Sequence, residues 1–395
     1  MGASIIQAGT RKLTHRERFQ RVFHYQTVDR GIHWEFGYLG ETVERWHSEG
    51  MPKNLVSIEG PGSIEDYFGV DPIVMLPVNL GLHPPFEGKA KILKVEGNRR
   101  VVQDPDGTVF EQNIDGTKTI PNYIKMPIAD RDDWKRFKER LQSDTPGRCD
   151  ADWRALGAEL AKSDVPVVVW LGSYFGIPRN WIGFENIALM CYDDRDLVEE
   201  IVETLTELYL SQLSACLKEV RVDMAWGWED ICFRNGPIIS PKMFSEIVGT
   251  RLKRVCDLLR QHGCDVIMTD CDGYIEPLVP VWLDAGLNCM FPIEVHSGTD
   301  PMKLREKFGK QILLRGGLEK YRLAKGKREI IDELKCVEKL VAEGGYVPHG
   351  DHRIPEDVSY DNYRYYIREK LAMLGWPADE AEAIEPLKGV KSEWS

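Results

Sequence analysis

The sequence lacks long apolar runs, basic stretches and the features of a secreted protein. No run of about 18 apolar residues occurs, and the first residues contain no apolar signal-peptide core, so we expect a soluble cytoplasmic protein. The chain carries 51 Lys and Arg against 63 Asp and Glu, which gives a net charge of -12 without any long basic run. Binding to nucleic acid or to a membrane surface is therefore not expected.

Several short motifs are missing as well. The nine cysteines are scattered without a CxxC pair, which predicts reduced thiols instead of a disulfide framework. No P-loop, GxGxxG, GxSxG or HExxH motif is present, which argues against an NTPase, a Rossmann dehydrogenase, an esterase and a zincin. No internal repeat or linker divides the chain, so we expect a single domain over residues 1–395.

The sequence is rich in short apolar runs that alternate with amphipathic stretches. Six runs follow residue 160, and they span 165–170, 222–228, 264–270, 287–294, 310–317 and 344–351. Two earlier runs span 31–36 and 71–76. Continuous apolar runs are typical of parallel strands covered on both faces, and repeated strand–helix units indicate a βαβ architecture. Eight such strands predict an α/β fold, the (β/α)₈ TIM barrel.

One segment interrupts this pattern. Two strand-like stretches flank the sequence DPDG at residues 104–107, which is a hairpin signal. The pattern therefore predicts an antiparallel hairpin insertion near residues 85–125. We expect this insertion to lie over one mouth of the barrel as a lid.

Chemically active side chains follow the predicted strands. In a TIM barrel the active site lies at the carboxyl ends of the strands, so the residues after each run are candidates. Carboxylates that meet in a barrel mouth raise one another's pKa unless a cation lies between them, and a metal ion meets that need. The candidates at the strand ends are His33, Trp34, Glu35, Ser173, Tyr174, Trp228, Glu229, Asp230, Asp270, Cys271, Asp272, Glu294, His296, Arg315, His349, Asp351 and His352.

The densest cluster is the sequence Asp270-Cys271-Asp272-Gly273. One interpretation is a strand-to-helix loop in which Asp272 caps a helix that starts near Tyr274. The other is a zinc site with an open coordination position, made by carboxylates and a histidine from a distant strand end. Alternation along a strand places Asp270 and Asp272 on one face, so we expect Cys271 to point away from the site.

A second cluster surrounds His349 and His352 in the sequence PHGDHRIP. These histidines either lie in a solvated loop or act as metal ligands or acid–base groups. Glu294 is likewise either a loop carboxylate or a functional acid. The two glycines after Arg315 indicate a tight turn more than a phosphate cradle. The tryptophans near the strand ends either fill the barrel or form an aromatic wall for a flat substrate.

Long segments of the chain resemble a known family. The opening LTHRERFQRVFHYQTVDR is similar to the start of uroporphyrinogen-decarboxylase-like proteins. The segments DCDGYIEPLVPVWLDAGLNCMFPIEVHSGTDP, GGLEK and GGYVPHGDHRIPEDVSYDNYRYY also match, so the resemblance covers residues 13–375. It implies a (β/α)₈ barrel, in agreement with the strand pattern.

The resemblance points to one branch of that family more than to the other. True decarboxylases carry an R-Q-A-G-R-type segment whose arginines meet the propionates of the porphyrinogen. The corresponding region here reads HWEFGYLGETVERW, which argues against porphyrinogen decarboxylation. The segments FGYLGETVERWHSEGMP and VNLGLHPPFEG are more similar to the methyl-donor-side enzymes of corrinoid O-demethylases. Those enzymes pass a methyl group from a methoxylated aromatic to a Co(I) corrinoid on a partner protein.

This resemblance implies a corrinoid-dependent methyltransferase with a small methoxyaromatic donor. The corrinoid would come from a partner protein, because the chain has no D-x-H-x-x-G fingerprint. Asp270, Asp272 and His352 would hold zinc at positions similar to the family's thiolate-rich site, with Cys271 or Glu294 as alternate ligands. The candidate catalytic residues are Glu229, His349 and Glu294. The candidate substrate-binding residues are Trp34, Glu35, Tyr174, Trp228 and Arg315.

Two other functions stay open at this point. A decarboxylase or other lyase, acting on a tetrapyrrole or a smaller acid, would polarise its substrate through Asp272 or Glu229 and hold a carboxylate on Arg315, without a metal. A non-catalytic barrel would bind a corrinoid or tetrapyrrole as a carrier or regulator. One barrel fold supports many chemistries, so the fold does not decide among these functions.

Overall fold

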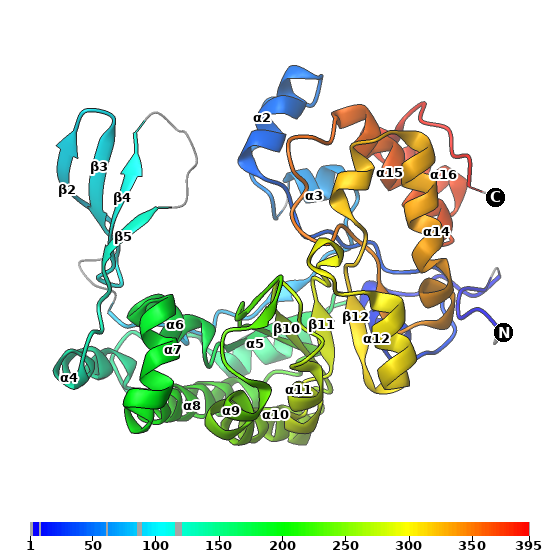
Figure 1. The fold of residues 1–395 in the computed structure, drawn as a ribbon. Coiled ribbons are helices and arrows are strands. Elements are labelled where there is room, and N and C mark those ends of the chain that lie inside the picture. Colours follow the sequence, from blue (N-terminus) through cyan, green and yellow to red (C-terminus); the bar gives the residue numbers. More distant parts are fainter. Residues whose placement is uncertain (1–2, 8, 61, 85–88, 115–120, 395) are drawn as a thin grey trace.

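A curved parallel sheet forms the centre of the computed structural model (Figure 1). The structure describes residues 3–7, 9–60, 62–84, 89–114 and 121–394. The strand order is β1-β6-β7-β10-β11-β12-β13, and every neighbouring pair is parallel. This half-barrel confirms the predicted TIM-like α/β class. The strands are β1 (Val74–Met75), β6 (Val167–Gly172), β7 (Met224–Trp228), β10 (Val266–Asp270), β11 (Cys289–Phe291), β12 (Leu313–Arg315) and β13 (Tyr346–Val347).

Helices connect the strands and cover the outer face of the sheet (Figure 1). Helix α1 begins with a capping box, because Thr14 accepts from the backbone of Glu17 and the Glu17 carboxylate accepts from the backbone of Thr14. The longer helices are α8 (Arg195–Leu217), α10 (Thr250–Gln261), α14 (Lys327–Glu343) and α15 (Tyr360–Met373). The shorter helices are α1 (His15–Phe23), α2 (Gly40–Ser48), α3 (Ile64–Tyr67), α4 (Arg131–Lys138), α5 (Trp153–Leu160), α6 (Gly176–Ile182), α7 (Phe184–Asp193), α9 (Pro241–Phe244), α11 (Val279–Ala285), α12 (Pro301–Phe308), α13 (Lys320–Leu323) and α16 (Ala378–Ala383).

Two apolar clusters explain why the strands read as continuous apolar runs. The inner cluster contains alternate strand residues such as Met224, Met268 and Cys289, together with Phe19 of α1, which closes the amino-terminal end of the barrel. The outer cluster contains the intervening residues, such as Ile267, and packs against the helices. Both faces of each strand are therefore buried, as a parallel sheet requires.

The eighth predicted strand, residues 31–36, is not a strand, which corrects that prediction. The segment still occupies the position between β13 and β1. On one side, the carbonyl of His33 accepts from the backbone N–H of Asp71 at 2.8 Å, just before β1. On the other side, the carbonyl of Gly37 accepts from the N–H of Ile354 at 3.0 Å. Isolated backbone contacts, including a parallel bridge between Tyr38 and Ile354, therefore close the barrel here instead of a continuous ladder.

A buried lysine of α15 lies in the seam between this segment and β13. Lys370 Nζ donates to the carbonyl of Trp34 at 2.9 Å and to the carbonyl of Pro348 at 3.4 Å, one on each side of the seam. It also pairs with the carboxylate of Glu35, which accepts from Tyr366 Oη at 3.2 Å. Burial lowers the pKa of Lys370 and raises that of Glu35, and the attraction between the two charges opposes both shifts.

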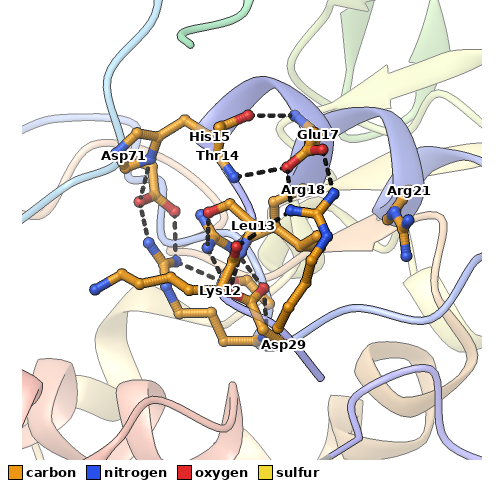
Figure 2. A network of polar contacts seen from close by, with 12 residues as sticks. Lys12, Leu13, Thr14, His15, Glu17, Arg18, Arg21, Asp29 and Asp71 are labelled. Atoms are coloured by element: carbon orange, nitrogen blue, oxygen red, sulfur yellow. Dashed lines mark hydrogen bonds and ion pairs between the residues drawn. The ribbon is translucent and has the colours of Figure 1, made fainter. Parts of the chain in front are cut away.

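A second polar network fixes the amino-terminal segment at the opposite end of the barrel (Figure 2). Asp71 accepts from Arg30 at 2.8 and 2.6 Å and from the backbone N–H of His33 at 2.9 Å. Its carboxylate lies 3.0 Å from His15 Nδ1 at the start of α1. Burial alone would raise the pKa of Asp71, but the contacts with Arg30 and His15 outweigh it and hold that pKa well below its ordinary value.

The predicted insertion is a four-stranded antiparallel sheet, larger than the hairpin expected from the sequence. Its strands are β2 (Lys91–Glu96), β3 (Arg99–Gln103), β4 (Val109–Asn113) and β5 (Asn122–Lys125), and the DPDG sequence turns between β3 and β4. The parts of the predicted insertion at 85–88 and 115–120 lie outside the described residues. Figure 1 shows this sheet projecting to one side of the barrel. A lid role stays a prediction.

Two general features complete the fold. Across the described ranges, every helix is too short or too polar to span a bilayer. All nine cysteines are free thiols, and seven of them are buried.

We expect Lys370→Met to destabilise the protein by about 3–5 kcal/mol, because it leaves the buried Glu35 carboxylate without its cation. Urea unfolding followed by circular dichroism measures this loss. The double variant Lys370→Met, Glu35→Gln should recover most of it, since the unpaired charge is then removed.

Lys388→Met is the matched control, because Lys388 pairs with Glu385 at an exposed site where both side chains are at least 60% accessible. Its effect should stay within about 0.5 kcal/mol. An equal effect of the two lysine substitutions would contradict a closing role for the buried pair.

Candidate active site

On five neighbouring strands, one side chain each points into the barrel at the same height near the carboxyl end of the sheet. We call these residues the inward-facing level. Asp270 of β10 is in register with Trp228 of β7 and with Phe291 of β11. The register of β11 with β12 places Phe291 beside Arg315, which pairs with Val347 of β13. Met268 and Cys289 lie two residues below in the inner apolar cluster. The first polar groups above the apolar floor are therefore Asp270 and Arg315.

Arg315 is the buried cation of this level, with 7% of its surface exposed. Its Nε donates to His349 Nε2 at 3.2 Å, and its Nη2 donates to the carbonyl of Glu35 at 3.1 Å. Its guanidinium carbon lies 4.9 Å from the ring centroid of Trp34 and 4.6 Å from that of Phe291. Burial lowers its pKa, but a guanidinium remains protonated at neutral pH.

His349 is fully buried beside this arginine. Its Nδ1 lies 2.7 Å from the carbonyl of Gly350, and its Nε2 faces the N–H of Arg315. The neutral tautomer with the proton on Nδ1 satisfies both contacts. Burial, and then the charge of Arg315, lower the pKa of His349 well below its ordinary value. The arrangement suits a residue that orients Arg315.

Three carboxylates form the acidic side of the mouth, at Asp230, Asp270 and Asp272. Burial raises the pKa of Asp270 well above its ordinary value, and the charges of Asp272 and Asp230 raise it further. Burial also raises the pKa of Asp230, which pairs with Arg179 at 3.3 Å. Asp270 therefore holds a proton more readily than an ordinary aspartate.

His352 and Asp272 form a pair at the rim, with 3.2 Å between Nε2 and Oδ2. Two ligands on a tetrahedral zinc, each about 2.0–2.1 Å from it, lie about 3.3 Å apart, so this pair has the spacing of two ligands. No group of three His, Cys, Asp or Glu side chains in the described part of the chain is close enough to hold a metal ion. The zinc set Asp270, Asp272 and His352 stays a prediction, and no step below uses zinc.

The alternative interpretation of Asp272 as a helix cap is wrong. The next helix, α11, begins at Val279, and its N-cap Leu278 makes no side-chain cap bond. Cys271 lies in the outer apolar cluster, where its thiol accepts from the N–H of Ile231 at 3.4 Å. Its neighbour Asp270 continues the inward-facing row of Met268, as the alternation predicted.

Glu229 lies behind the mouth and organises the loop after β6. Its carboxylate accepts from the backbone N–H groups of Tyr174, Phe175 and Gly176 at 2.9, 2.8 and 3.1 Å. It thereby caps the start of α6. Burial raises the pKa of Glu229 to about 7 against the effect of these hydrogen bonds. Tyr174 itself packs against Tyr209 in the outer cluster, away from the inward-facing level.

Glu294 joins two loops at the rim. Its carboxylate accepts from the N–H of Gly273 at 2.9 Å and from Ser297 Oγ at 2.6 Å, and it lies 3.7 Å from Lys320 Nζ. Lys320 also lies 3.9 Å from the buried Asp351. Glu294 therefore holds the Gly273 loop next to the Asp272 side chain.

The backbone is strained at two of these strand ends. Asp230 follows β7 with φ 40°, and Ile293 follows β11 with φ 58°, both in the left-handed region. A Cβ at Gly316, directly after β12, would lie 1.8 Å from the carbonyl of Pro292. Gly316 and Gly317 both have positive φ, 100° and 84°, as the predicted tight turn requires, and Gly316 also allows close chain packing. Strain of this kind concentrates at functional sites.

Lys370 and Phe36 are site residues that the strand-end rule does not find. Lys370 belongs to α15, where it lies on the buried helix face that also carries Tyr363, Tyr366 and Leu374. A charged residue at an otherwise apolar helix position is the sequence signal that could have identified it. Phe36 lies 5.1 Å from the ring of His352 and 4.5 Å from that of Phe291. Phe36 thus connects His352 at the rim with the Phe291 ring in the barrel interior.

A surface hollow of 620 Å³ lies outside this mouth, along α8. Two of its carboxylates form ion pairs, Glu200 with Lys138 at 2.9 Å and Glu203 with Arg251 at 2.8 Å.

Comparisons with known proteins agree with this architecture. The profile of the family described as uroporphyrinogen decarboxylase (URO-D) matches residues 113–369, more than half of the chain. A solved structure of a methyltransferase from Methanosarcina mazei is similar to the chain, with a TM-score of 0.53 and 15% sequence identity. The likeness covers 95% of this chain and 97% of that chain, and at this identity it concerns the fold. No curated protein sequence matches the chain.

Glu229→Ala should loosen the loop before α6, because three backbone N–H groups lose their acceptor. We expect the amides of Tyr174, Phe175 and Gly176 to exchange hydrogen at least about tenfold faster, in line with the loss of charge-assisted hydrogen bonds. Hydrogen exchange with mass spectrometry measures this rate. The exposed Glu185→Ala in α7 is the control, and unchanged exchange at 174–176 in Glu229→Ala would contradict the capping role.

Proposed function

The chain belongs to the uroporphyrinogen decarboxylase family, and on that premise we propose that it is a methyltransferase. It moves a methyl group from a small methoxyaromatic donor to the corrinoid of a partner protein. The observation that carries this proposal is the inward-facing level of the barrel, where a carboxyl group, Asp270, stands among the rings of Trp228 and Phe291. That level offers an acid and flat apolar walls in one place.

The chemical task is to help an ether oxygen leave. When the C–O bond of a methoxyarene breaks, its electron pair stays on the oxygen, and a phenolate is a poor leaving group unless it gains a proton. Asp270 supplies that proton from its carboxyl oxygen and ends the step as a carboxylate. Its burial, and then the charges of Asp272 and Asp230, raise the pKa of Asp270, which favours its protonated form.

Aromatic side chains orient the substrate for this proton transfer. Trp170 and Trp226 lie edge to face with 6.2 Å between centroids, and Trp226 contacts Phe291 in the same manner at 6.0 Å. Such rings bind a planar substrate through offset and edge-to-face contacts. They also exclude water from the acid, which strengthens its electrostatic interactions with the substrate.

The corrinoid supplies the nucleophile that accepts the methyl group. The rim has features that suit contact with a partner, because Phe184 and Phe233 are 42% and 49% exposed and their rings lie 4.9 Å apart. Phe233 follows β7, so these rings stand near the carboxyl ends of the strands. Exposed apolar groups beside a reactive mouth are typical of interaction surfaces.

A decarboxylase is the second candidate, and the buried Arg315 is the observation that favours it. A cation in the barrel interior suits an acid substrate. The two functions differ in their products, since a decarboxylase releases CO₂ and a methyltransferase releases a phenol. Incubation with carboxyl-labelled substrate, with and without reduced corrinoid, separates them.

Asp270→Asn should lower kcat for methyl transfer by about 100-fold or more, because it removes the proton donor while keeping the shape of the side chain. Spectroscopic loss of Co(I) in the presence of a methoxyarene measures the rate. The exposed Asp284→Asn in α11 is the matched control and should retain parental activity.

The pH dependence gives an independent test of the same role. The protonated form of Asp270 is the active form, so kcat should be highest at low pH and fall as pH rises through its raised pKa. This falling limb should be absent in Asp270→Asn. A rate that rises with pH in the parent enzyme would contradict the acid role.

Zinc stays a prediction, and metal analysis tests it. Because only His352 and Asp272 of the predicted ligands are in contact, we expect less than one zinc per chain after dialysis against a mild chelator. One tightly held zinc per chain, lost in the variant Asp272→Ala, His352→Ala, would show that the three predicted ligands assemble around the ion. That result would assign the leaving oxygen to a Lewis acid.

A further inference from the structure

We infer that Cys232 and Cys271 form a redox site, at which a peroxide joins the two thiols in a disulfide that displaces the acidic side of the mouth. Formation of this bond does not depend on the reaction that the protein catalyses. Its effect on methyl transfer rests on the proposed function.

The first argument is the contact between the two thiols. Cys232 lies in β8 (Cys232–Phe233), Cys271 directly follows β10, and both side chains belong to the outer apolar cluster. The two thiols are hydrogen-bonded to each other. Cys271 Sγ also accepts from the backbone N–H of Ile231, next to Cys232, at 3.4 Å. A disulfide bond is about 2.0 Å long, so two sulfurs in hydrogen-bond contact need only a short approach to form it.

The second argument is the backbone that holds the two segments together. The N–H of Tyr274 donates to the carbonyl of Phe233 at 2.9 Å. Gly273 has φ 87°, and a Cβ at this position would lie 2.6 Å from the carbonyl oxygen of Cys232. The loop after β10 therefore approaches β8 this closely because residue 273 is a glycine. This approach places the two cysteines next to each other before any oxidation.

The third argument is the access of an oxidant to one of the thiols. Strand β8 forms a two-stranded sheet with β9 (Gly236–Pro237), and the turn at residues 233–235 is exposed. A sheet of two residues per strand is marginally stable and opens locally. Such an opening exposes Cys232, whereas Cys271 stays behind it in the outer cluster. Cys232 is therefore the thiol that meets the oxidant first.

The chemistry takes two steps with hydrogen peroxide as the oxidant. The Cys232 sulfur attacks the peroxide, so the O–O bond breaks, an S–O bond forms, and the departing hydroxide leaves with the thiol proton as water. The Cys271 sulfur then attacks the sulfenic acid at Cys232. The S–O bond breaks, the S–S bond forms, and the second hydroxide leaves with the Cys271 proton as water. Two thiols and one peroxide thus give one disulfide and two waters.

The disulfide would act on the mouth through the carboxylates beside it. Cys271 separates Asp270 from Asp272 in the chain, and Cys232 follows Asp230 by two residues. The Cys271 thiol donates to the carbonyl of Asp272 at 3.5 Å, and a disulfide sulfur has no proton to donate. Oxidation therefore removes this contact and draws the loop after β10 towards β8. Asp270 is then displaced from the inward-facing level, where the proposed proton transfer takes place.

Oxidation of the intact protein tests the site without any methyl transfer. Folded protein is treated with hydrogen peroxide, and the remaining thiols are blocked with N-ethylmaleimide before unfolding and digestion. Mass spectrometry should find the peptides of Cys232 and Cys271 joined, and dithiothreitol should separate them. No 232–271 link in folded protein, or one that forms only after unfolding, would overturn the inference.

Two variants locate the oxidation. Cys232→Ser should leave Cys271 free for N-ethylmaleimide. Cys264→Ser is the matched control, because Cys264 is as buried as Cys271 but its thiol donates to the carbonyl of Val266 at 3.8 Å. This control should form the 232–271 link as the parent does. A link from Cys271 to a different cysteine in the folded parent would overturn the assignment.

Rates of methyl transfer then test the effect on the mouth. With Co(I) corrinoid freed of excess reductant, the oxidised parent should react at least about tenfold more slowly than the reduced parent, since small displacements of reacting groups have effects of this size. Cys232→Ser should keep the parental rate before and after peroxide. Equal rates for the linked and reduced parent would overturn control of the mouth. A 232–271 link in a protein that transfers no methyl group in either state would sustain the redox site and remove the methyltransferase.

Discussion

The buried pair of Lys370 and Glu35 is the contact on which the mouth of this barrel depends. The lysine donates to carbonyls on both sides of the seam where an eighth strand would lie, so a side chain replaces part of a strand ladder. The same Glu35 offers its backbone carbonyl to Arg315. Glu35 therefore connects the seam with helix α15, through Lys370, and with the buried cation Arg315. A shift of that pair would move Arg315 relative to the strands beside it.

Burial determines the electrostatics of the site. In a low-dielectric interior each charge needs a partner, and the described structure supplies one for almost every group. Lys370 has Glu35, Asp230 has Arg179, and Glu229 has backbone amides. Asp270 is driven toward its neutral form by burial and by neighbouring carboxylates. Arg315 keeps its charge, and its two hydrogen-bond acceptors, the His349 ring and the carbonyl of Glu35, are neutral.

Local sequence pattern predicted the sheet and the level of the site well. Seven of the eight expected runs are strands, because continuous apolar runs report burial on both faces. Alternation within β10 also placed Asp270 inward and Cys271 outward, since side-chain direction in a strand follows from the backbone alone. The run at 31–36 is apolar for the same reason of burial, but a lysine more than three hundred residues away occupies its hydrogen-bonding carbonyl. No local pattern reports such a partner.

The sequence by itself determined the fold class, the family and the strand ends that carry chemistry, because each depends on residues close together along the chain. The tertiary structure decided which of those strand ends meet. It brought Asp270, Phe291 and Arg315 to one level, paired His352 with Asp272, and turned Glu229 and Tyr174 away from the mouth. The physical reason is that distances between strand ends depend on register and barrel curvature, which arise only when distant segments pack together.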